Sequence, residues 1–502
     1  MTESEVAGDG RSLRSVAAQF SGGALLSVLT LLAAPAVGAA QDGARPPVTP
    51  EDLSEDARQF VSVDAPVVAI TGVRLVDGTG SPAAEGRTVV LRDGRIVAVG
   101  RDGRVEIPDG ADVLDRSGYT LTPGFVGLHN HTFYTTSSRQ TQLTFSAPRL
   151  YLASGVTTIR TTGSYSPYSE INLMESIEAG DVPGPSTHIT GPYITGEGGG
   201  SSMYQVEGPD DARRVVDYWA GEGATWYKAY TRISRAALGA AIEEAHGHGL
   251  KFTAHLCSVT FTEAVELGID NLEHGYFTNT GWYPGKEPDR CPDGFREHLA
   301  TLDIDSEQVE ETIRTMVEND VALTSTLAVY ELSVPNRPPL SKIERALNVM
   351  APEVREEYLS TRQSIAERAE ESHMPAVFRK AQQFELAFHE AGGLLAAGVD
   401  PTGIGGALPG FGDQRNFELL VEAGFEPVEA IRVMTYNGAR VLGVDGELGT
   451  VEEGKRADLV LIDGNPLEDP GEIRSVTTVF KDGVGYDAGK LVDAVRGVAG
   501  VR

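Results

Sequence analysis

The feature that most constrains the fold is the alternation of strand-like and helix-like segments through the middle of the chain. The strand candidates are residues 124–131, 156–163, 187–194, 225–230, 251–256, 271–275, 322–327 and 394–401. Amphipathic stretches such as "ALGAAIEEAHGHG" lie between some of them. This alternation predicts an α/β fold with a parallel sheet. Eight strands with helical crossovers is the number found in a (β/α)₈ TIM barrel.

Short alternating strands with glycine turns flank this middle part on both sides, from about Val67 and again near the C-terminus. We therefore expect a small β-sandwich that both ends of the chain form together. The predicted parts are an N-terminal arm (41–65), a first sandwich part (66–122), the barrel (123–440), and a second sandwich part with a C-terminal tail (441–502). Long insertions after Gly275 and Leu327 are candidate lids or substrate loops.

Residues 1–40 differ in kind from the rest. Arg11 and Arg14 precede the apolar run "GGALLSVLTLLAAPAVGAA", which ends in small residues before a polar stretch. This pattern is typical of a secretory signal peptide, so we expect a periplasmic or secreted protein without a membrane span after cleavage. An uncleaved membrane anchor is the alternative, although the apolar run is of marginal length for a span.

The charge balance excludes one class of partner. With 72 acidic and 42 basic residues the formal net charge is -30, and no basic tract exists to bind nucleic acid. The two cysteines, Cys257 and Cys291, are too few for a disulfide framework. We expect them to be unpaired structural thiols.

Residues that can bind metal ions stand at the ends of several strand candidates. His129 and His131 are two residues apart, so on a strand they point to the same side and can hold one ion. The active site of a parallel barrel lies at the carboxyl ends of its strands. The residues expected to converge there are His129, His131, Lys228, His255, His274 and Asp400. Each alone has a plain structural explanation, so the prediction rests on the six together.

Lys228 ends the apolar stretch "ATWYKAY", where an ammonium group needs compensation or neutralisation. Two interpretations are open from the residues alone. One is a buried ion pair with Glu197 or Asp400. The other is an amine that burial makes neutral within a metal site.

The motifs "PGFVGLHNH", "WYKAY", "TAHL", "LEHG" and "AGVDP", in this order, resemble the amidohydrolase superfamily of metal-dependent hydrolases. The resemblance covers roughly residues 66–488. Because Lys228 ends the fourth strand, the chain is similar to one branch of this superfamily, whose members have a binuclear metal site and a carboxylated lysine. This branch is related to imidazolonepropionase-like proteins and Xaa-Pro dipeptidases (prolidases). The motifs are specific for the superfamily and poorly specific for the substrate.

The resemblance implies a cofactor and a role for each ligand. Two divalent metal ions are expected, with zinc first because imidazole and carboxylate ligands suit it. Lys228 is expected to react with carbon dioxide and become N6-carboxylysine, which bridges both ions. His129, His131 and Asp400 are expected to bind one ion, and His255 and His274 the other.

The expected reaction is hydrolysis of an amide bond in a small, peptide-like or N-acyl amino acid substrate. A metal-bridging hydroxide attacks the carbonyl, and Asp400 is the catalytic residue that passes the proton to the leaving amine. By resemblance to prolidase-like members, Tyr230 is expected to bind a substrate carboxylate or carbonyl. Arg160 ends the second strand and is either a carboxylate clamp or part of a structural ion pair.

Other functions stay open at this point. A lactonase or esterase would use the same metal site. A mononuclear deaminase would not need Lys228, and a non-catalytic scaffold would not need all six ligands. The resemblance also leaves a homo-oligomer open.

Overall fold

The computed structural model describes residues 47–502, and the signal peptide predicted for residues 1–40 lies outside this range. Ten strands form one sheet in which every pairing between neighbours is parallel, in the order β11-β10-β7-β18-β17-β16-β15-β14-β12-β13. Their bounds are β7 Phe125–Asn130, β10 Val156–Thr161, β11 Ser186–His188, β12 Ile194–Thr195, β13 Tyr204–Gln205, β14 Trp226–Ala229, β15 Lys251–Ala254, β16 Asn271–Glu273, β17 Ala322–Ser325 and β18 Leu395–Ala397.

Each of the eight strand candidates overlaps an observed strand, which confirms the predicted α/β class with a parallel sheet. The third candidate is split into β11 and β12. Through β11 this segment pairs with β10, and through β12 it pairs with β14. An isolated bridge between Thr190 and Trp226 lies between these two pairings.

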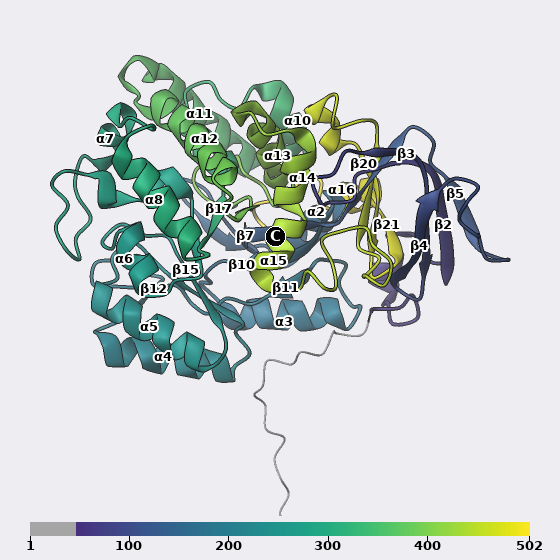
Figure 1. Cartoon of the computed structure of the whole chain (residues 1–502), viewed down its shortest axis with the longest axis horizontal. Coiled ribbons are helices and arrows are strands. Elements are labelled where there is room, and N and C mark those ends of the chain that lie inside the picture. The colour runs from purple at the N-terminus through teal and green to yellow at the C-terminus, as the bar shows by residue number, and fades with distance from the viewer. Residues whose placement is uncertain (1–46) are drawn as a thin grey trace, which may run out of the picture. The chain divides into compact units, whose positions relative to one another are not determined.

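Helices connect the strands and cover the sheet (Figure 1). They are α1 Glu55–Arg58, α2 Ser146–Ala153, α3 Pro167–Glu178, α4 Pro209–Gly221, α5 Arg235–Gly247, α6 Phe261–Glu266, α7 Phe295–Thr301, α8 Glu307–Glu318, α9 Leu327–Glu331, α10 Leu340–Val349, α11 Pro352–Glu367, α12 Met374–Glu390, α13 Phe411–Ala423, α14 Pro427–Met434, α15 Tyr436–Leu442 and α16 Ala488–Ala494. Local sequence signals fix the first residues of several of these helices. Thr260 and Glu263 form a capping box at α6, and proline occupies the first turn of α3, α4, α11 and α12.

Strands from both ends of the chain form a second sheet of nine strands (Figure 1). Its members are β1 Val61–Val63, β2 Val67–Leu75, β3 Ala84–Arg92, β4 Arg95–Arg101, β5 Asp112–Asp115, β6 Tyr119–Pro123, β19 Leu459–Asp463, β20 Val476–Lys481 and β21 Val484–Asp487. The two chain ends meet where β6 pairs antiparallel with β19. Buried side chains of this sheet, such as Val89 and Phe480, form a core of their own.

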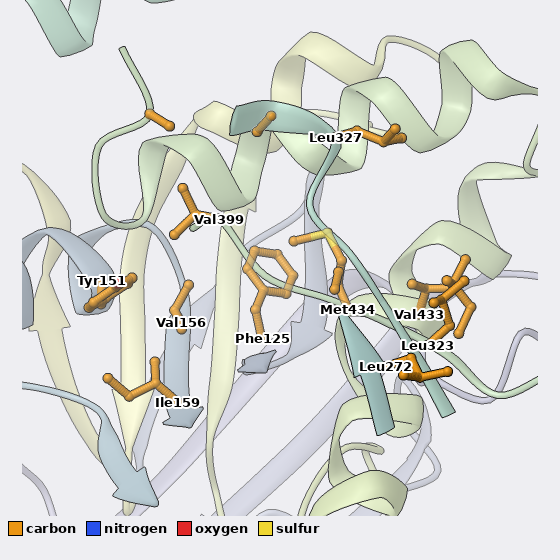
Figure 2. Packing of buried hydrophobic residues seen from close by; sticks show 14 of the residues in the cluster. Phe125, Tyr151, Val156, Ile159, Leu272, Leu323, Leu327, Val399, Val433 and Met434 are labelled. Carbon is orange, nitrogen blue, oxygen red and sulfur yellow. The ribbon is translucent and has the colours of Figure 1, made fainter. Parts of the chain in front are cut away.

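The main core surrounds the parallel strands. β7, β10 and β14 are buried along their whole length, as expected for parallel strands with both faces covered. Figure 2 shows Phe125 of β7 close to Met434 of α14, with Val156 and Ile159 of β10 beside them. This packing holds the strands in fixed register, and their carboxyl ends therefore present side chains at fixed positions.

Two expectations from the sequence are corrected here. The predicted N-terminal arm is not a separate surface segment, because β1 pairs with β21 and the side chains of Ala57 and Phe60 are buried. Cys257 and Cys291 form a disulfide with a Cα–Cα distance of 5.1 Å, so they are not free thiols. Their sequence separation of 34 residues gave no hint of this proximity, which the insertion after β16 creates.

Among the described residues, no helix is both long and apolar enough to cross a membrane.

A short hairpin, β8 Phe133–Thr135 with β9 Gln140–Gln142, follows β7 directly. The insertion between β16 and β17 holds the short 3₁₀ turns Gly275–Phe277 and Thr280–Trp282 together with α7 and α8. The insertion between β17 and β18 holds α9 to α12. Both long insertions predicted from the sequence are therefore structured segments that follow strand ends.

Candidate metal centre

The six predicted ligands meet at the carboxyl ends of β7, β14, β15, β16 and β18. His129 Nε2 lies 3.0 Å from Lys228 Nζ and 3.6 Å from Asp400 Oδ2. His131 Nε2 lies 3.6 Å from Asp400 Oδ1, and His274 Nε2 lies 3.9 Å from Asp400 Oδ2. The ring of His255 is 4.4 Å from that of His274, centroid to centroid. The structure therefore brings all six residues into one cluster.

The backbone turns sharply at two of these residues. His274 has φ +68° and Asp400 has φ +47°, both in the left-handed region that non-glycine residues rarely adopt. Each lies just beyond its strand, so the turn directs the side chain toward the centre of the cluster. The Asp400 N–H donates to the His129 carbonyl at 2.7 Å, which fixes the turn to β7. Non-glycine residues in this conformation often mark functional sites.

A buried carboxylate outside the six predicted ligands orients His129. Glu273, at the end of β16, accepts a hydrogen bond from His129 Nδ1 at 2.6 Å. A carboxylate can only accept, so Nδ1 carries the proton and Nε2 offers its lone pair to the cluster. Glu273 also accepts from Thr253 Oγ1 at 2.6 Å and is fully buried. The signal that could have revealed it is an acidic residue inside the buried strand "NLE".

Two other histidines have ring nitrogens that the protein leaves unsatisfied. His274 Nδ1 is bound to Thr326 Oγ1 at 2.7 Å, and its buried Nε2 has no hydrogen-bond partner within residues 47–502. His131 Nδ1 is likewise buried without a partner in this part of the chain. Buried polar atoms are normally paired, so the orphaned His274 Nε2, 3.9 Å from Asp400 Oδ2, is what a metal site requires. The ligand atoms of His129, His131 and Asp400 lie within 4.8 Å of one another, which fits one divalent cation.

Burial also sets the protonation states that metal ligation needs. It lowers the pKa values of His129, His131 and His274, and lowers that of His255 to about 3, so the imidazoles are neutral at neutral pH. Burial raises the pKa of Asp400, but its interactions with His129, His131 and Lys228 outweigh this effect and hold the pKa well below its usual range. Neutral imidazoles and an ionised carboxylate are the binding forms of these ligands.

Lys228 is 1% exposed, and among residues 47–502 no carboxylate lies within ion-pair distance of its Nζ. The buried ion pair with Glu197 or Asp400 is therefore not formed. Its near neighbours are His129 Nε2 and the ring of Tyr193, 5.3 Å from Nζ. Burial lowers the Lys228 pKa to about 8, so roughly a tenth of the amine is neutral at pH 7.

The proposed role of Arg160 as a substrate clamp is corrected by the structure. Its side chain is fully buried and donates to Glu273 Oε1 at 2.5 Å, Asn271 Oδ1 at 2.9 Å and the Leu128 carbonyl at 2.9 Å. The guanidinium also stacks over Trp226 at 4.4 Å. Arg160 thus forms a structural ion pair with Glu273, because β10 directs its side chain into the protein interior and not toward solvent.

Tyr230 lies at the rim of the cluster. Its ring is 4.7 Å from that of His255 and 5.4 Å from that of Tyr193, and it is partly exposed. The Tyr193 hydroxyl lies 3.4 Å from His131 Nε2. Tyr330 of α9 lies on another side, 5.4 Å from the ring of His274. Aromatic rings from three elements therefore flank the candidate ligands.

Comparison with known proteins agrees with this arrangement. Residues 120–485 match the family described as the Amidohydrolase family. An N-acyl-D-aspartate deacylase of Alcaligenes xylosoxydans xylosoxydans is 44% identical over 71 residues, which is 14% of this chain and 14% of the deacylase. The match thus spans only a small part of that enzyme.

Solved structures resemble the fold over most of the chain. A Xaa-Pro dipeptidase with methionine bound in its active site has a TM-score of 0.63 at 21% identity, covering 84% of this chain and 100% of the dipeptidase. The ochratoxinase of A. niger has a TM-score of 0.60 at 20% identity, and the match covers 84% of this chain and 95% of the ochratoxinase. The family match covers well over half of the sequence and includes the six clustered ligands, and on that basis this chain belongs to the Amidohydrolase family.

Proposed function

We propose that this protein is an exported hydrolase that uses two divalent metal ions to cleave an amide bond in a small peptide-like or N-acyl amino acid substrate. One observation carries the proposal: four histidines, Asp400 and Lys228 cluster at one edge of the parallel sheet, and Lys228 is buried there without a carboxylate partner among residues 47–502. Family membership and the likeness to a Xaa-Pro dipeptidase support the assignment to carbon–nitrogen bonds and to the prolidase-like branch.

The parallel sheet is the wall of a closed (β/α)₈ barrel in this proposal. Closure is supported by the segment from Ser186 to Thr195, which pairs with β10 on one side and with β14 on the other. The barrel spans residues 123–440. The second sheet is the sandwich domain, with parts at 66–122 and 441–502.

The ligands divide into two sets. His129, His131 and Asp400 would hold one ion, and His255 and His274 the other, with zinc as the first candidate. Lys228 would bridge both sets as N6-carboxylysine: its neutral amine forms an N–C bond to carbon dioxide and releases a proton. The lowered Lys228 pKa makes this reaction accessible near neutral pH. When bound, the ions lower the pKa of a coordinated water and polarise a carbonyl oxygen.

Asp400 is the residue that moves the proton. Thr402 Oγ1 donates to Asp400 Oδ1 at 2.8 Å, which fixes the carboxylate plane and leaves Oδ2 facing His129 and His274. The carboxylate is ionised at neutral pH and is 7% exposed, so it can meet a substrate. It accepts the proton of the attacking water and delivers it to the nitrogen of the leaving amine.

Lactone or ester hydrolysis is the second candidate. It is favoured by one observation, the aromatic side chains of Tyr193, Tyr230 and Tyr330 around the ligands, which would suit an apolar neutral ring. A mononuclear deaminase is disfavoured by the buried Lys228 beside His129. A panel that pairs each amide substrate with the corresponding ester separates these reactions.

Export is supported by two features. The signal pattern at residues 1–40 is one, and the Cys257–Cys291 disulfide is the other, because such bonds persist in oxidising compartments. Fractionation of the host cells, with mass spectrometry of the mature N-terminus, tests this part of the proposal. A full-length chain in the cytoplasm would contradict it.

Elemental analysis of the purified mature protein tests the metal centre. Two divalent ions per chain are expected, with one or fewer in Lys228→Met and two in the control Lys490→Met, whose lysine is exposed. One ion in the wild-type protein would overturn the binuclear site. No ion after growth with ample metal would overturn the proposed chemistry altogether.

The role of Asp400 has its own test. Asp400→Asn should retain most of the bound metal while turnover of the amide substrate falls by about 100-fold or more. Asp305→Asn, at an exposed position, is the matched control and should behave like the wild type. An Asp400→Asn variant with near-wild-type turnover would refute the proton-transfer role.

A further inference from the structure

Asn130, the last residue of β7, stands between His129 and His131 and is not one of the candidate ligands. Its side chain is fully buried. The Val399 N–H donates to Asn130 Oδ1 at 3.0 Å, and Asn130 Nδ2 donates to Asp413 Oδ1 at 3.1 Å. One side-chain amide therefore joins three segments: the end of β7, the turn after β18 and the first turn of α13.

These two contacts require an acceptor and a donor on the same short side chain. A backbone N–H can only donate, so the amide oxygen faces Val399. Asp413 is buried, and its other carboxylate oxygen accepts the Gly410 N–H at 3.0 Å, so Asp413 offers Asn130 an acceptor. At position 130 an aspartate would lack the donor, and a leucine would lack both groups. Hydrogen bonding as well as space therefore determines which residue fits here.

The contacts of Asn130 lie where β7 meets β18. In the part of the chain that the structure describes, β18 pairs in register with β7 only at Ala397, whereas it pairs with β17 at three positions. Beyond Ala397, the Asp400 N–H donates to the His129 carbonyl at 2.7 Å. The N–H of the preceding residue, Val399, donates to the Asn130 side chain instead of a backbone carbonyl. Asn130 thus replaces a backbone partner where the ladder between the two strands ends.

Two glycines allow β7 and β18 to approach closely at the level of the ligands. A Cβ atom at Gly127 would lie 2.1 Å from Asn130 Nδ2. A Cβ atom at Gly398 would lie 2.3 Å from the backbone nitrogen of His129. Both distances are too short for nonbonded atoms, so only glycine fits at these two positions. The strand ends are therefore in direct contact, and a shift of one displaces the other.

The turn that Asn130 holds contains a residue in an unfavourable conformation. Asp400 has φ +47°, which persists only where surrounding contacts impose it. Without the Asn130 amide, the Val399 N–H loses its partner and the turn can relax. The Asp400 carboxylate would then move relative to His129 Nε2 and His131 Nε2, each of which lies 3.6 Å from one of its oxygens.

We propose that Asn130 is a positioning residue that holds the Asp400 turn against β7, in the geometry that metal binding and proton transfer require. This inference rests on the proposed function of Asp400 and adds a residue that acts through it. Because Asn130 does not contact the substrate, its loss should lower kcat more than it changes KM. It should also weaken the ion that His129, His131 and Asp400 would hold.

The test compares Asn130→Ala with Asn437→Ala in the zinc-loaded mature protein. Asn437 is the matched control, because it is buried and its Nδ2 donates at 2.8 Å to the Leu395 carbonyl at the opposite end of β18. Both variants should unfold at lower urea concentrations than the wild type. Only Asn130→Ala should release one ion at a chelator concentration about 10- to 100-fold lower. Only Asn130→Ala should lower kcat about 10- to 100-fold, with a smaller change in KM, for the amide that the wild type cleaves fastest. Equal effects of both variants on the ion and on kcat would overturn the positioning role.

An exchange of the two side chains tests the same contact even if Asn130→Ala fails to fold. Asn130→Asp places two acceptors opposite each other, and Asp413→Asn leaves one amide facing two donors. The double variant restores a donor opposite every acceptor. It should therefore regain the chelator resistance and the kcat that the single variants lose. A double variant that regains the urea midpoint but neither of these would overturn the positioning role.

Chelator competition needs no substrate, so it separates this inference from the proposed function. If the wild type hydrolyses no amide but Asn130→Ala releases one ion early, the proposed function fails and the positioning of the ligands stands. If the wild type hydrolyses an amide and Asn130→Ala keeps both ions and an unchanged kcat, the Asn130 inference is overturned while amide hydrolysis stands.

Discussion

Glu273→Gln offers the sharpest test of how the metal centre is held. The wild-type carboxylate accepts from His129 Nδ1, Arg160 Nη2 and Thr253 Oγ1 while being fully buried. A glutamine of the same shape has one accepting oxygen and one donating nitrogen. Whichever way the amide turns, a donor faces either the His129 N–H or the Arg160 N–H.

Both orientations have a cost that the structure allows us to estimate. Removing the charge leaves the Arg160 guanidinium without its carboxylate partner, and breaking a buried pair in this way costs about 3–5 kcal/mol of the free energy of unfolding. If the amide nitrogen faces His129, the imidazole must shift its proton to Nε2, the atom that faces the cluster. Loss of such an outer-shell partner lowers metal affinity by about 10- to 100-fold.

Two measurements follow on the same protein samples. Urea unfolding of the metal-free protein reports the stability loss, and competition with a chelator reports metal affinity. Glu243→Gln is the matched control, because its ion pair with Arg213 is exposed and such pairs contribute about 0–1 kcal/mol. If Glu273→Gln loses no more stability than the control and binds metal as tightly as the wild type, our account of Glu273 is wrong.

Two further predictions concern stability. Burial raises the pKa of Glu170 from 4.5 to about 8, so the folded carboxyl keeps a proton that the unfolded chain releases between these values. The free energy of unfolding should therefore fall as pH rises through this window, and Glu170→Gln should flatten the fall in urea denaturation series between about pH 5 and pH 8; an unchanged slope would refute the assignment. The Cys257–Cys291 disulfide closes a loop with a sequence separation of 34, so replacing both cysteines with alanine should cost about 3 to 4 kcal/mol of the free energy of unfolding. A reductant should reproduce this loss in the wild type and leave the double variant unchanged, whereas a reductant effect on the variant would contradict it.

The sequence determined the parts of this protein that follow from local patterns. Strand-like segments separated by helical stretches indicated a parallel sheet. The rule that sites lie at the carboxyl ends of such strands predicted that His129, Lys228 and Asp400 lie together, as they do in the structure. Each of these inferences needs only the position of a residue along its own strand. The position of a residue along its strand follows from the periodic pattern of apolar and polar residues, so it can be predicted without knowing the tertiary contacts.

Tertiary structure decided the contacts between segments distant in sequence. Arg160 and Glu273 are 113 residues apart, and only the packing inside the sheet turns Arg160 from a plausible clamp into the partner of the carboxylate that orients His129. The pairing of Cys257 with Cys291 likewise depends on where a long insertion folds back. The sequence names the groups that can bind metal or anions. Which of them remain uncommitted depends on which neighbours satisfy the others, and this is fixed by three-dimensional packing.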